Sequence, residues 1–295
     1  MTTVIQDFTT EDIDYVRHGD RPLTLRLFRP AGAGPFPAVV VLHPGGWAHV
    51  DLTGCQQQGE AWAQAGLTIA SLDFRQGADR YPSSLIDINY AIRWLKSNAG
   101  GFNINPDQVG LSGYSSGGHL AMLAAMRLDD PRYTEIPVGD GAAAFDATVR
   151  CVGVAWPVID PLSRYRHTKR HLTGEAAALW AQSTPEDHHR LDGIVDYHHL
   201  YWRDEDDMAE GSPLLALERG ETLANPPVLW VQGKPDVVHD YRDLDSDVDV
   251  NEPERFAHSY RAAGGDIDLL YVDYAKRMGP ASFDSLAAFF RKHLS

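Results

Sequence analysis

The sequence is poor in cysteine and has no long apolar run. Its 295 residues include only two cysteines, Cys55 and Cys151, too few for a disulfide framework in a chain of this size. We expect both thiols to be free and buried. No stretch of about 18 consecutive apolar residues is present, so no transmembrane helix is predicted. The first residues, Met1 to Asp7, show neither the basic nor the apolar segment of a signal peptide, and we expect a cytoplasmic protein without membrane contact.

Basic residues are also scarce. Lysine and arginine number 26 against 41 acidic residues, which gives a formal net charge of −15. Such a charge repels phosphate, so nucleic acid and anionic membrane surfaces are not expected partners. The hydrophobic share of 43% is ordinary for a globular protein. The charge says little else about the substrate, except that a highly anionic one would need a local basic pocket.

The apolar pattern alternates between strands and helices along most of the chain. Residues 38–42 and 67–72 are continuous apolar runs, typical of central strands buried on both faces. Residues 83–97 repeat apolar positions with helical spacing. This alternation predicts an α/β fold, with a mostly parallel twisted sheet and helices on both faces. The expected strands are 23–28, 38–42, 67–72, 108–112, 228–231 and 267–272, and the expected helices are 56–65, 83–97, 118–127, 252–263 and 283–293.

One stretch interrupts the alternation. Residues 157–225 are rich in histidine, aromatic and charged residues and contain no clear strand. We interpret them as a helical cap inserted over the carboxyl edge of the sheet. Strands of the same kind flank the insertion, so residues 1–295 are predicted to form one domain with a cap.

The segment Gly113-Tyr114-Ser115-Ser116-Gly117 lies between a predicted strand and a small-residue helix. A serine at such a sharp strand–turn–helix junction projects from the top of the sheet as an exposed nucleophile. The N–H group of Ser116, at the start of the helix, is suited to stabilise an oxyanion. Ser115 is therefore the candidate nucleophile.

A second glycine-rich turn, His43-Pro44-Gly45-Gly46-Trp47, follows the strand at 38–42. Glycines in this position leave backbone N–H groups free to face a carbonyl oxygen. Gly45 and Gly46 are thus predicted to complete an oxyanion hole with Ser116. His43 is expected to support the loop rather than act as a base.

Together these segments resemble a known family. The two turns, the stretch from Asp73 to Leu95, Asn105-Pro106-Asp107 and the residues up to Ala121 are similar to α/β-hydrolases of the acetyl-esterase and hormone-sensitive-lipase-like group. Kynurenine-formamidase-like and feruloyl-esterase-like enzymes belong to the same neighbourhood. The resemblance implies an α/β-hydrolase fold and hydrolysis of carboxylic esters, or amides, through an acyl-enzyme on Ser115, without a cofactor.

The resemblance also implies an acid but supplies no base. It places the acid after the strand 228–231, where Gly233-Lys234-Pro235-Asp236 matches and assigns that role to Asp236. It places the histidine after the strand 267–272, yet residues 273–279 contain none. A serine hydroxyl needs a base within hydrogen-bond reach. The candidate replacements are His239, Lys276 and the cap histidines His167, His171, His188, His189, His198 and His199.

Because the base is missing from its usual place, a second class of function stays open. The chain is alternatively a non-hydrolytic protein with this fold, either a ligand-binding pseudoenzyme or a lyase or isomerase that uses the oxyanion hole. No metal site is expected, since the acidic run from Asp243 to Asp249 lacks the glycine of a calcium loop. A homodimer through residues 269–272 or 283–290 is a further prediction.

Overall fold

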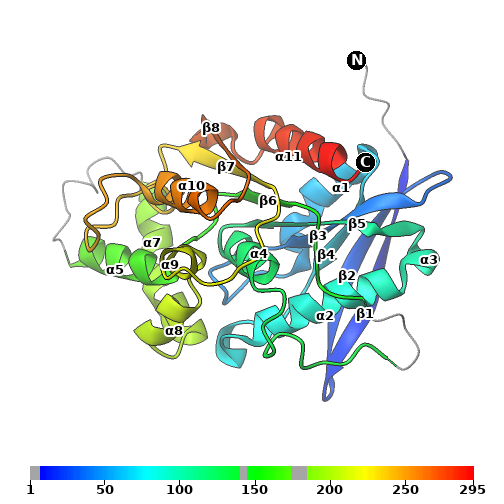
Figure 1. The fold of residues 1–295 in the computed structure, drawn as a ribbon, viewed down its shortest axis with the longest axis horizontal. Coiled ribbons are helices and arrows are strands. Elements are labelled where there is room, and N and C mark those ends of the chain that lie inside the picture. The colour runs from blue at the N-terminus through cyan, green and yellow to red at the C-terminus, as the bar shows by residue number, and fades with distance from the viewer. Residues whose placement is uncertain (1–6, 140–144, 174–184) are drawn as a thin grey trace.

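A computed structural model describes residues 7–139, 145–173 and 185–295. Its centre is an eight-stranded sheet with the strand order β1-β2-β4-β3-β5-β6-β7-β8 (Figure 1). The strands are β1 (Phe8–His18), β2 (Arg21–Pro30), β3 (Phe36–Leu42), β4 (Thr68–Leu72), β5 (Ile104–Tyr114), β6 (Val152–Ala155), β7 (Val228–Lys234) and β8 (Ile267–Asp273).

The sheet is parallel over six of its strands. β2 pairs antiparallel with β1 and β4, whereas the six strands β3 to β8 all run parallel to one another. β3 lies in the middle, where Ala38 to Leu42 pair with both neighbours and are 0–1% exposed. The predicted α/β-hydrolase fold, with a mostly parallel sheet, is confirmed.

The strand β1 is absent from the predicted elements. Most of its residues are exposed, and its sequence Phe-Thr-Thr-Glu-Asp-Ile-Asp carries few apolar side chains. It forms a long hairpin with β2 at the edge of the sheet. An edge strand solvated on most of its surface gives little hydrophobic periodicity, because its backbone pairing rather than its side chains holds it in place.

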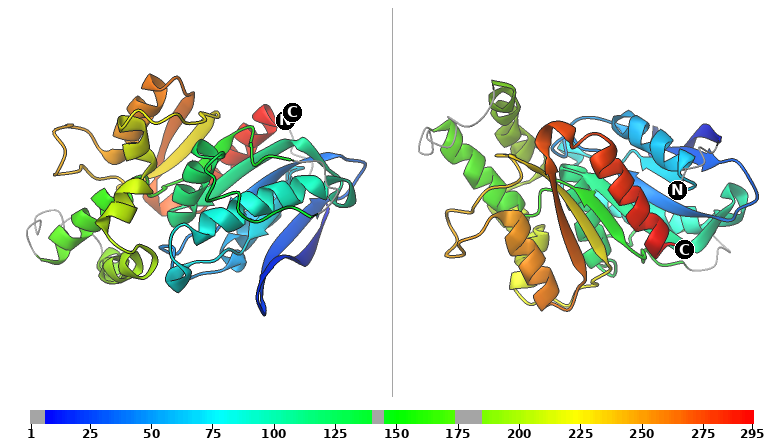
Figure 2. Two further views of the ribbon diagram at one scale, coloured as in Figure 1. Left: turned by 60° about the horizontal axis from the view of Figure 1, so that its bottom comes forward. Right: turned by 90° about the horizontal axis from the view of Figure 1, so that it is seen from above.

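Helices cover both faces of the sheet. α2 (Ser83–Ser97), α4 (Ser116–Met126) and α10 (Glu252–Ala262) pack into one apolar core, and α1 (Gln56–Gln64) and α11 (Pro280–His293) pack into the other. Figure 2 (right) shows α11 lying across the sheet on the same side as α1. The short helix α3 (Ala99–Phe102) follows α2. Cys55 and Cys151 are free and buried, as predicted, and burial raises the pKa of each thiol to about 12.

In its described residues, the cap stretch consists of helices joined by turns and coil, without a strand. It contains α5 (Pro161–Leu172), α7 (Pro185–Tyr201), α8 (Glu205–Glu210) and α9 (Pro213–Glu218), which gather at the end of the sheet to which the parallel strands point (Figure 1). The division into one domain with a cap at residues 157–225 stays a prediction. Among the described residues, no helix is both long and apolar enough to cross a membrane.

Candidate active site

Ser115 lies at the sharp junction between β5 and α4. Its backbone angles, φ 49° and ψ −118°, fall in a region that non-glycine residues rarely adopt. The flanking glycines make the junction sterically feasible. A Cβ atom on Gly113 would lie 2.2 Å from the carbonyl oxygen of Gly117, and one on Gly117 would lie 2.4 Å from the carbonyl oxygens of Leu42 and His43. The five-residue pattern is therefore required by backbone packing.

His239 contacts the Ser115 hydroxyl. Its Nε2 lies 3.0 Å from Ser115 Oγ, and its Nδ1 lies 2.9 Å from Asp236 Oδ2. An ionised carboxylate can only accept, so Nδ1 carries the hydrogen and Nε2 accepts from the serine. Asp236 and His239 are 5% and 4% exposed. The three side chains form one continuous hydrogen-bonded chain.

A single loop after β7 supplies both the carboxylate and the imidazole. Asp236 Oδ1 accepts from the backbone N–H groups of Val238 (3.0 Å) and His239 (3.2 Å), which closes a tight turn between the two. The Nε2 of Gln232, on β7, donates to Asp236 Oδ2 at 3.3 Å. The carboxylate therefore organises the turn that presents His239 toward Ser115.

The other candidate bases lie elsewhere. The loop after β8 forms the short helix η3 (Tyr274–Lys276), and the Lys276 side chain is 73% exposed with its nearest carboxylate, Asp273, 4.0 Å away. The interpretation of Lys276 as the base is not supported by this position.

Three of the described cap histidines bond to backbone carbonyl groups. His167 Nε2 donates to Val237 at 3.0 Å, His171 Nδ1 to His167, and His198 Nδ1 to Ile194, both at 2.7 Å. Burial lowers the pKa of His167 to about 3, which keeps its ring neutral. His199 Nε2 lies 3.3 Å from the Tyr165 hydroxyl. The side chains of His188 and His189 lie outside the described residues.

The glycine turn after β3 lies beside Ser115. Gly45, Gly46 and Trp47 all have positive φ angles, of 122°, 63° and 60°. A Cβ atom on Gly45 would lie 1.9 Å from the carbonyl oxygen of His49, so only glycine fits. Within the described residues, the N–H groups of Gly46 and Ser116 donate to no protein acceptor. Donors left in this state next to a nucleophile are suited to bind a developing oxyanion.

Two histidines hold this turn. His43 stacks on Phe74 with ring centroids 4.3 Å apart, and burial lowers its pKa to about 4. His119 accepts from the indole N–H of Trp47 at 3.0 Å through Nδ1 and donates to the carbonyl of Gly211 at 2.8 Å through Nε2. Burial lowers the pKa of His119 to about 3, so it stays neutral in this one tautomer.

His119 is not among the site residues predicted from the sequence. Its position one helical turn after Ser115, on the same side of α4, was the available signal. Its connection from Trp47 to the cap depends on tertiary contacts that the sequence pattern does not contain.

A cavity of about 730 Å³ surrounds Ser115 and His239. Three parts of the molecule form its walls: the Gly45 turn with the start of α1, the cap helices α5 and α7, and the segment that leads into α11. The lining includes Pro44, Gly45, Gly46, His49, Gln58, Glu60, Tyr114, Trp156, Arg164, Ile194, Tyr197, Val238, Arg277, Met278 and Phe283.

The cap aromatics divide between this cavity and the interior. Trp156 and Tyr197 line the cavity. Tyr201 and Trp202 instead pack around Trp47, with ring centroids 5.9 and 5.4 Å from it. Some of these aromatic side chains therefore shape the cavity while others fill the interior, and Trp180 lies outside the described residues.

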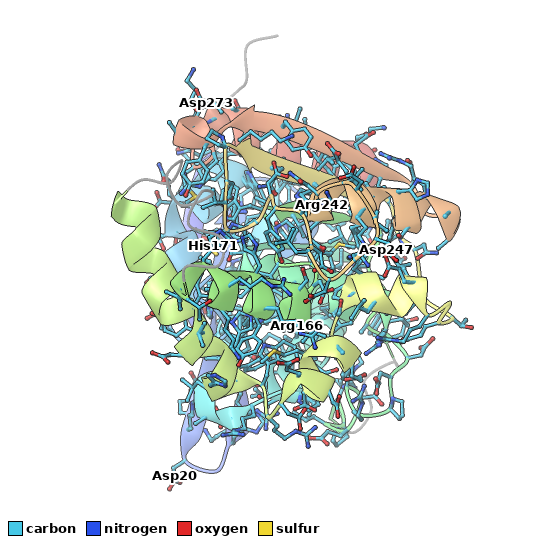
Figure 3. The ribbon with its side chains drawn as sticks, turned by 90° about the vertical axis from the view of Figure 1, so that its left-hand side faces the viewer. Asp20, Arg166, His171, Arg242, Asp247 and Asp273 are labelled. Atoms are coloured by element: carbon cyan, nitrogen blue, oxygen red, sulfur yellow. The ribbon has the colours of Figure 1, made fainter. Side chains whose placement is uncertain are left out.

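The acidic residues 243–249, which follow the loop after β7, form ion pairs with arginines. Asp243 Oδ2 lies 3.2 Å from Arg255 Nη1, and Asp249 Oδ1 lies 2.6 Å from Arg242 Nη1. Figure 3 shows this face of the molecule, with Arg242 and Asp247 on the loop and Arg166 on α5. Within the described ranges, no group of three metal-ligating side chains is assembled.

The strand order, the strained serine junction and the helices on both faces define an α/β-hydrolase. The BD-FAE family model matches residues 25–184, more than half of the chain. The chain belongs to the BD-FAE family.

Curated relatives and a solved structure are also similar. Esterase LipC of Mycobacterium tuberculosis is 31% identical over 123 residues, which cover 40% of this chain and 30% of LipC. The carboxylic ester hydrolase LipN of the same organism is 26% identical over 84% of this chain and 58% of LipN. The carboxylesterase EstE1, cloned from a metagenomic library, has a TM-score of 0.70 at 20% identity over 99% of this chain and 92% of its own.

These likenesses reach unequal parts of the relatives. The matched region spans about a third of LipC and less than two thirds of LipN. The EstE1 comparison covers nearly all of both chains, and at its level of identity it supports the fold.

Proposed function

We propose that this protein is a serine hydrolase of carboxylic esters, with Ser115 as nucleophile, His239 as general base and Asp236 as the acid that orients it. The hydrogen-bonded chain from Ser115 Oγ through His239 to Asp236 carries the proposal. The esterase names of the relatives support the same reaction class. Amides are the alternative substrate class, and their hydrolysis would require His239 to protonate the leaving nitrogen before the C–N bond breaks.

In the first half of the proposed reaction, the ester binds with its carbonyl carbon beside Ser115 Oγ. His239 Nε2 takes the hydroxyl proton as Oγ attacks, and the carbonyl oxygen becomes an oxyanion. The N–H groups of Gly45, Gly46 and Ser116 donate to it. Asp236 stabilises the imidazolium that forms. Collapse breaks the bond to the alcohol, which leaves with the proton from Nε2.

In the second half, water replaces the alcohol. His239 takes a proton from the water, which attacks the acyl-enzyme carbonyl, and the same donors stabilise the second oxyanion. Collapse returns the proton to Ser115 Oγ and releases the acid. The buried carboxylate of Asp236 holds the imidazole in one tautomer through both halves.

The non-hydrolytic alternative was based on the missing histidine. His239 lies within hydrogen-bonding distance of Ser115, so the absence of a histidine after β8 no longer argues against hydrolysis. The two readings differ in whether the serine is activated, and an active-site-directed reagent tests this directly.

A fluorophosphonate probe tests the proposal. We expect it to label the wild-type protein at Ser115, and labelling to disappear in Ser115→Ala and to slow strongly in His239→Ala. Release of p-nitrophenol from a short-chain p-nitrophenyl ester should follow the same order. A folded wild-type protein that neither reacts with the probe nor hydrolyses the ester would refute the esterase.

We further propose that the substrate is a small uncharged or singly charged molecule rather than nucleic acid, in keeping with the net charge of −15. A cytoplasmic location and a homodimer stay predictions. β8 lies at the edge of the sheet, which gives the dimer a place to form. Light scattering of the purified protein measures the dimer.

A further inference from the structure

The cavity around Ser115 has the opposite charge balance to the rest of the chain. Acidic residues outnumber basic ones by 41 to 26 overall. Among the side chains that line the cavity, two are guanidinium groups, Arg164 and Arg277, and one is a carboxylate, Glu60. Glu60 already accepts a hydrogen bond from Gln56 at 2.6 Å. The cavity is therefore locally basic within an acidic protein.

Arg277 is held in a defined orientation beside this cavity. Its Nη1 donates to the carbonyl of Tyr274 at 2.7 Å, and its guanidinium lies 3.5 Å from the centroid of the Tyr274 ring. The same group lies 5.7 Å from the centroid of Trp156, a second lining residue. Stacking of this kind fixes the guanidinium plane and leaves its edge available for a hydrogen-bonding partner.

Arg277 also differs from most arginines of this chain in its partners. Arg127, Arg255 and Arg75, among others, form ion pairs with carboxylates. In the part of the chain that the structure describes, no carboxylate lies within ion-pairing distance of Arg277. A preorganised guanidinium without a carboxylate partner, in the wall of a cavity, is a suitable receptor for an anionic group of a ligand.

We propose that Arg277 binds a carboxylate on the ester substrate, so that the enzyme prefers anionic esters, such as half-esters of short dicarboxylic acids, over neutral esters of the same length. The carbon chain of such a substrate would run along Trp156 from Ser115 to the guanidinium. This inference rests on the proposed esterase function and specifies its substrate class.

Two matched pairs of esters test the preference and locate the carboxylate. p-Nitrophenyl hydrogen glutarate and p-nitrophenyl valerate have acyl chains of equal length and differ in a terminal carboxylate. 4-Acetoxybenzoate and its methyl ester place the same difference on the leaving group. We expect kcat/KM for the anionic member of one pair to exceed that of its neutral partner about tenfold, as a charge-assisted hydrogen bond provides.

Variants separate a local contact from a general charge effect. Arg277→Gln should remove the preference, lowering kcat/KM for the anionic ester about tenfold and changing the neutral ester less than about twofold. Arg291→Gln is the matched control, because Arg291 is an exposed residue of α11 that does not line the cavity and its loss changes the net charge equally. It should leave both esters unchanged.

The outcomes are distinguishable. Two results would overturn the inference and leave the proposed esterase function intact. One is equal kcat/KM for the neutral and the anionic ester in both pairs. The other is an equal effect of Arg277→Gln and Arg291→Gln on kcat/KM. Turnover of none of the four esters, with no probe labelling of Ser115, would overturn the proposed function and this inference with it. Labelling of Arg277→Gln by a neutral alkyl fluorophosphonate at the wild-type rate shows that the variant is folded and active.

Discussion

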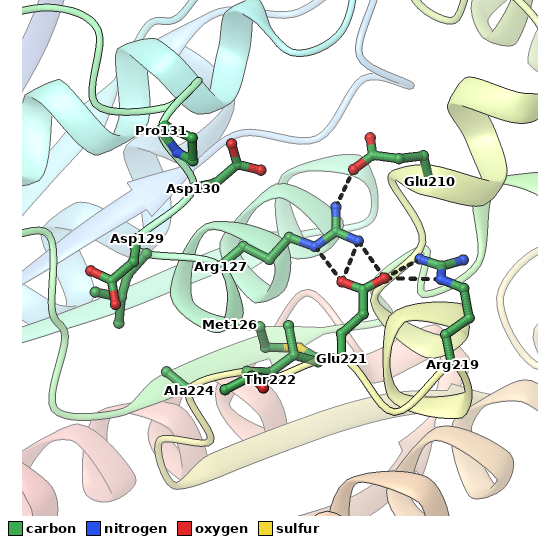
Figure 4. A pocket seen from close by; sticks show the side chains of 12 residues that line it. Met126, Arg127, Asp129, Asp130, Pro131, Glu210, Arg219, Glu221, Thr222 and Ala224 are labelled. Atoms are coloured by element: carbon green, nitrogen blue, oxygen red, sulfur yellow. Dashed lines mark hydrogen bonds and ion pairs between the residues drawn. The ribbon is translucent and has the colours of Figure 1, made fainter.

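Two cavities of similar size differ in whether the polar and charged groups that line them are already paired within the protein. The cavity at Ser115 measures about 730 Å³, and a hollow between the end of α4 and the helices α8 and α9 measures about 860 Å³. The larger hollow, shown in Figure 4, is lined by Arg127, Glu210, Arg219 and Glu221. Charge density and volume alone would point to it as the functional site.

The pairing of those charges argues otherwise. Arg127 lies 2.6 Å from Glu210 and 2.8 Å from Glu221, which also lies 2.7 Å from Arg219. The dashed contacts in Figure 4 link these side chains to one another. These four side chains are thus paired with one another, whereas the Ser115 cavity presents a serine hydroxyl bonded to a histidine and N–H donors without acceptors among the described residues. A site is recognised by groups that await a ligand, and the Arg127 cluster instead joins the end of α4 to the cap helix α8 and to the segment after α9.

The largest effect should come from breaking the hydrogen-bonded chain at Ser115. We expect Ser115→Ala and His239→Ala each to lower kcat on a p-nitrophenyl ester by about 10⁶-fold, since either loss disables the same proton transfer. Initial rates with purified variants measure this. Lys276→Ala is the control and should retain wild-type activity; a large loss in this variant alone would assign the base to Lys276.

The next effect should come from the orienting carboxylate. Asp236→Asn keeps the shape of the side chain and can still accept the N–H groups of Val238 and His239. Its amide can also donate to Nδ1, which favours the wrong imidazole tautomer, so we expect kcat to fall about 10⁴-fold. Thermal unfolding should show a nearly unchanged melting temperature. Wild-type kcat in this variant would mean that the carboxylate does not orient the base.

The ion-pair hollow should respond in stability rather than in rate. Arg127→Met leaves Glu210 and Glu221 without their shared cation, and because both carboxylates are about one third exposed, we expect the free energy of unfolding to fall by only about 1–3 kcal/mol. Urea denaturation measures this loss. kcat/KM of the folded variant should equal that of the wild type, and a rate loss exceeding about tenfold would place the hollow in the reaction after all.

The smallest effect should be a change in the pH dependence of the free energy of unfolding, caused by the buried pair Glu252 and Asp160. Burial and the proximity of Asp160 raise the pKa of Glu252 well above its ordinary range, and burial also raises that of Asp160. The folded state therefore binds more protons than the unfolded state above about pH 4, so stability falls as the pH rises through this range.

Glu252→Gln removes one of these two groups. Arg255 keeps Glu218 and Asp243 as partners, so we expect the variant to gain about 1 kcal/mol over the wild type at pH 8 and to match it near pH 4. Chemical denaturation at several pH values shows this. A parallel shift at all pH values would mean that Glu252 has the same pKa in the folded and unfolded states.

The sequence predicts those parts of the site that depend on neighbouring residues. Gly113, Ser115 and Gly117 occupy every second position of one short segment. A Cβ atom on either glycine would clash with neighbouring backbone, so the requirement is visible in the sequence as a local pattern. The Gly45-Gly46 turn is readable for the same reason. The central strands β3 and β4 are equally clear, because burial on both faces produces continuous apolar runs.

The base was harder to predict because its role depends on a turn. His239 follows Asp236 by three residues. The backbone N–H groups of Val238 and His239 donate to Asp236 Oδ1, and these hydrogen bonds fold the loop back so that the two side chains meet. The family resemblance instead predicts the histidine in the loop after β8. Likewise, the edge strand β1 escaped prediction because solvent on its surface removes the apolar alternation.

The proposed acid and base share one turn. A single short stretch of sequence, residues 236–239, therefore holds both side chains that would handle the proton. With the proposed acid and base both on the turn after β7, the loop after β8 supplies no group to the proton transfer. A substitution at Arg277 on that loop should therefore change the choice of substrate rather than the chemical step.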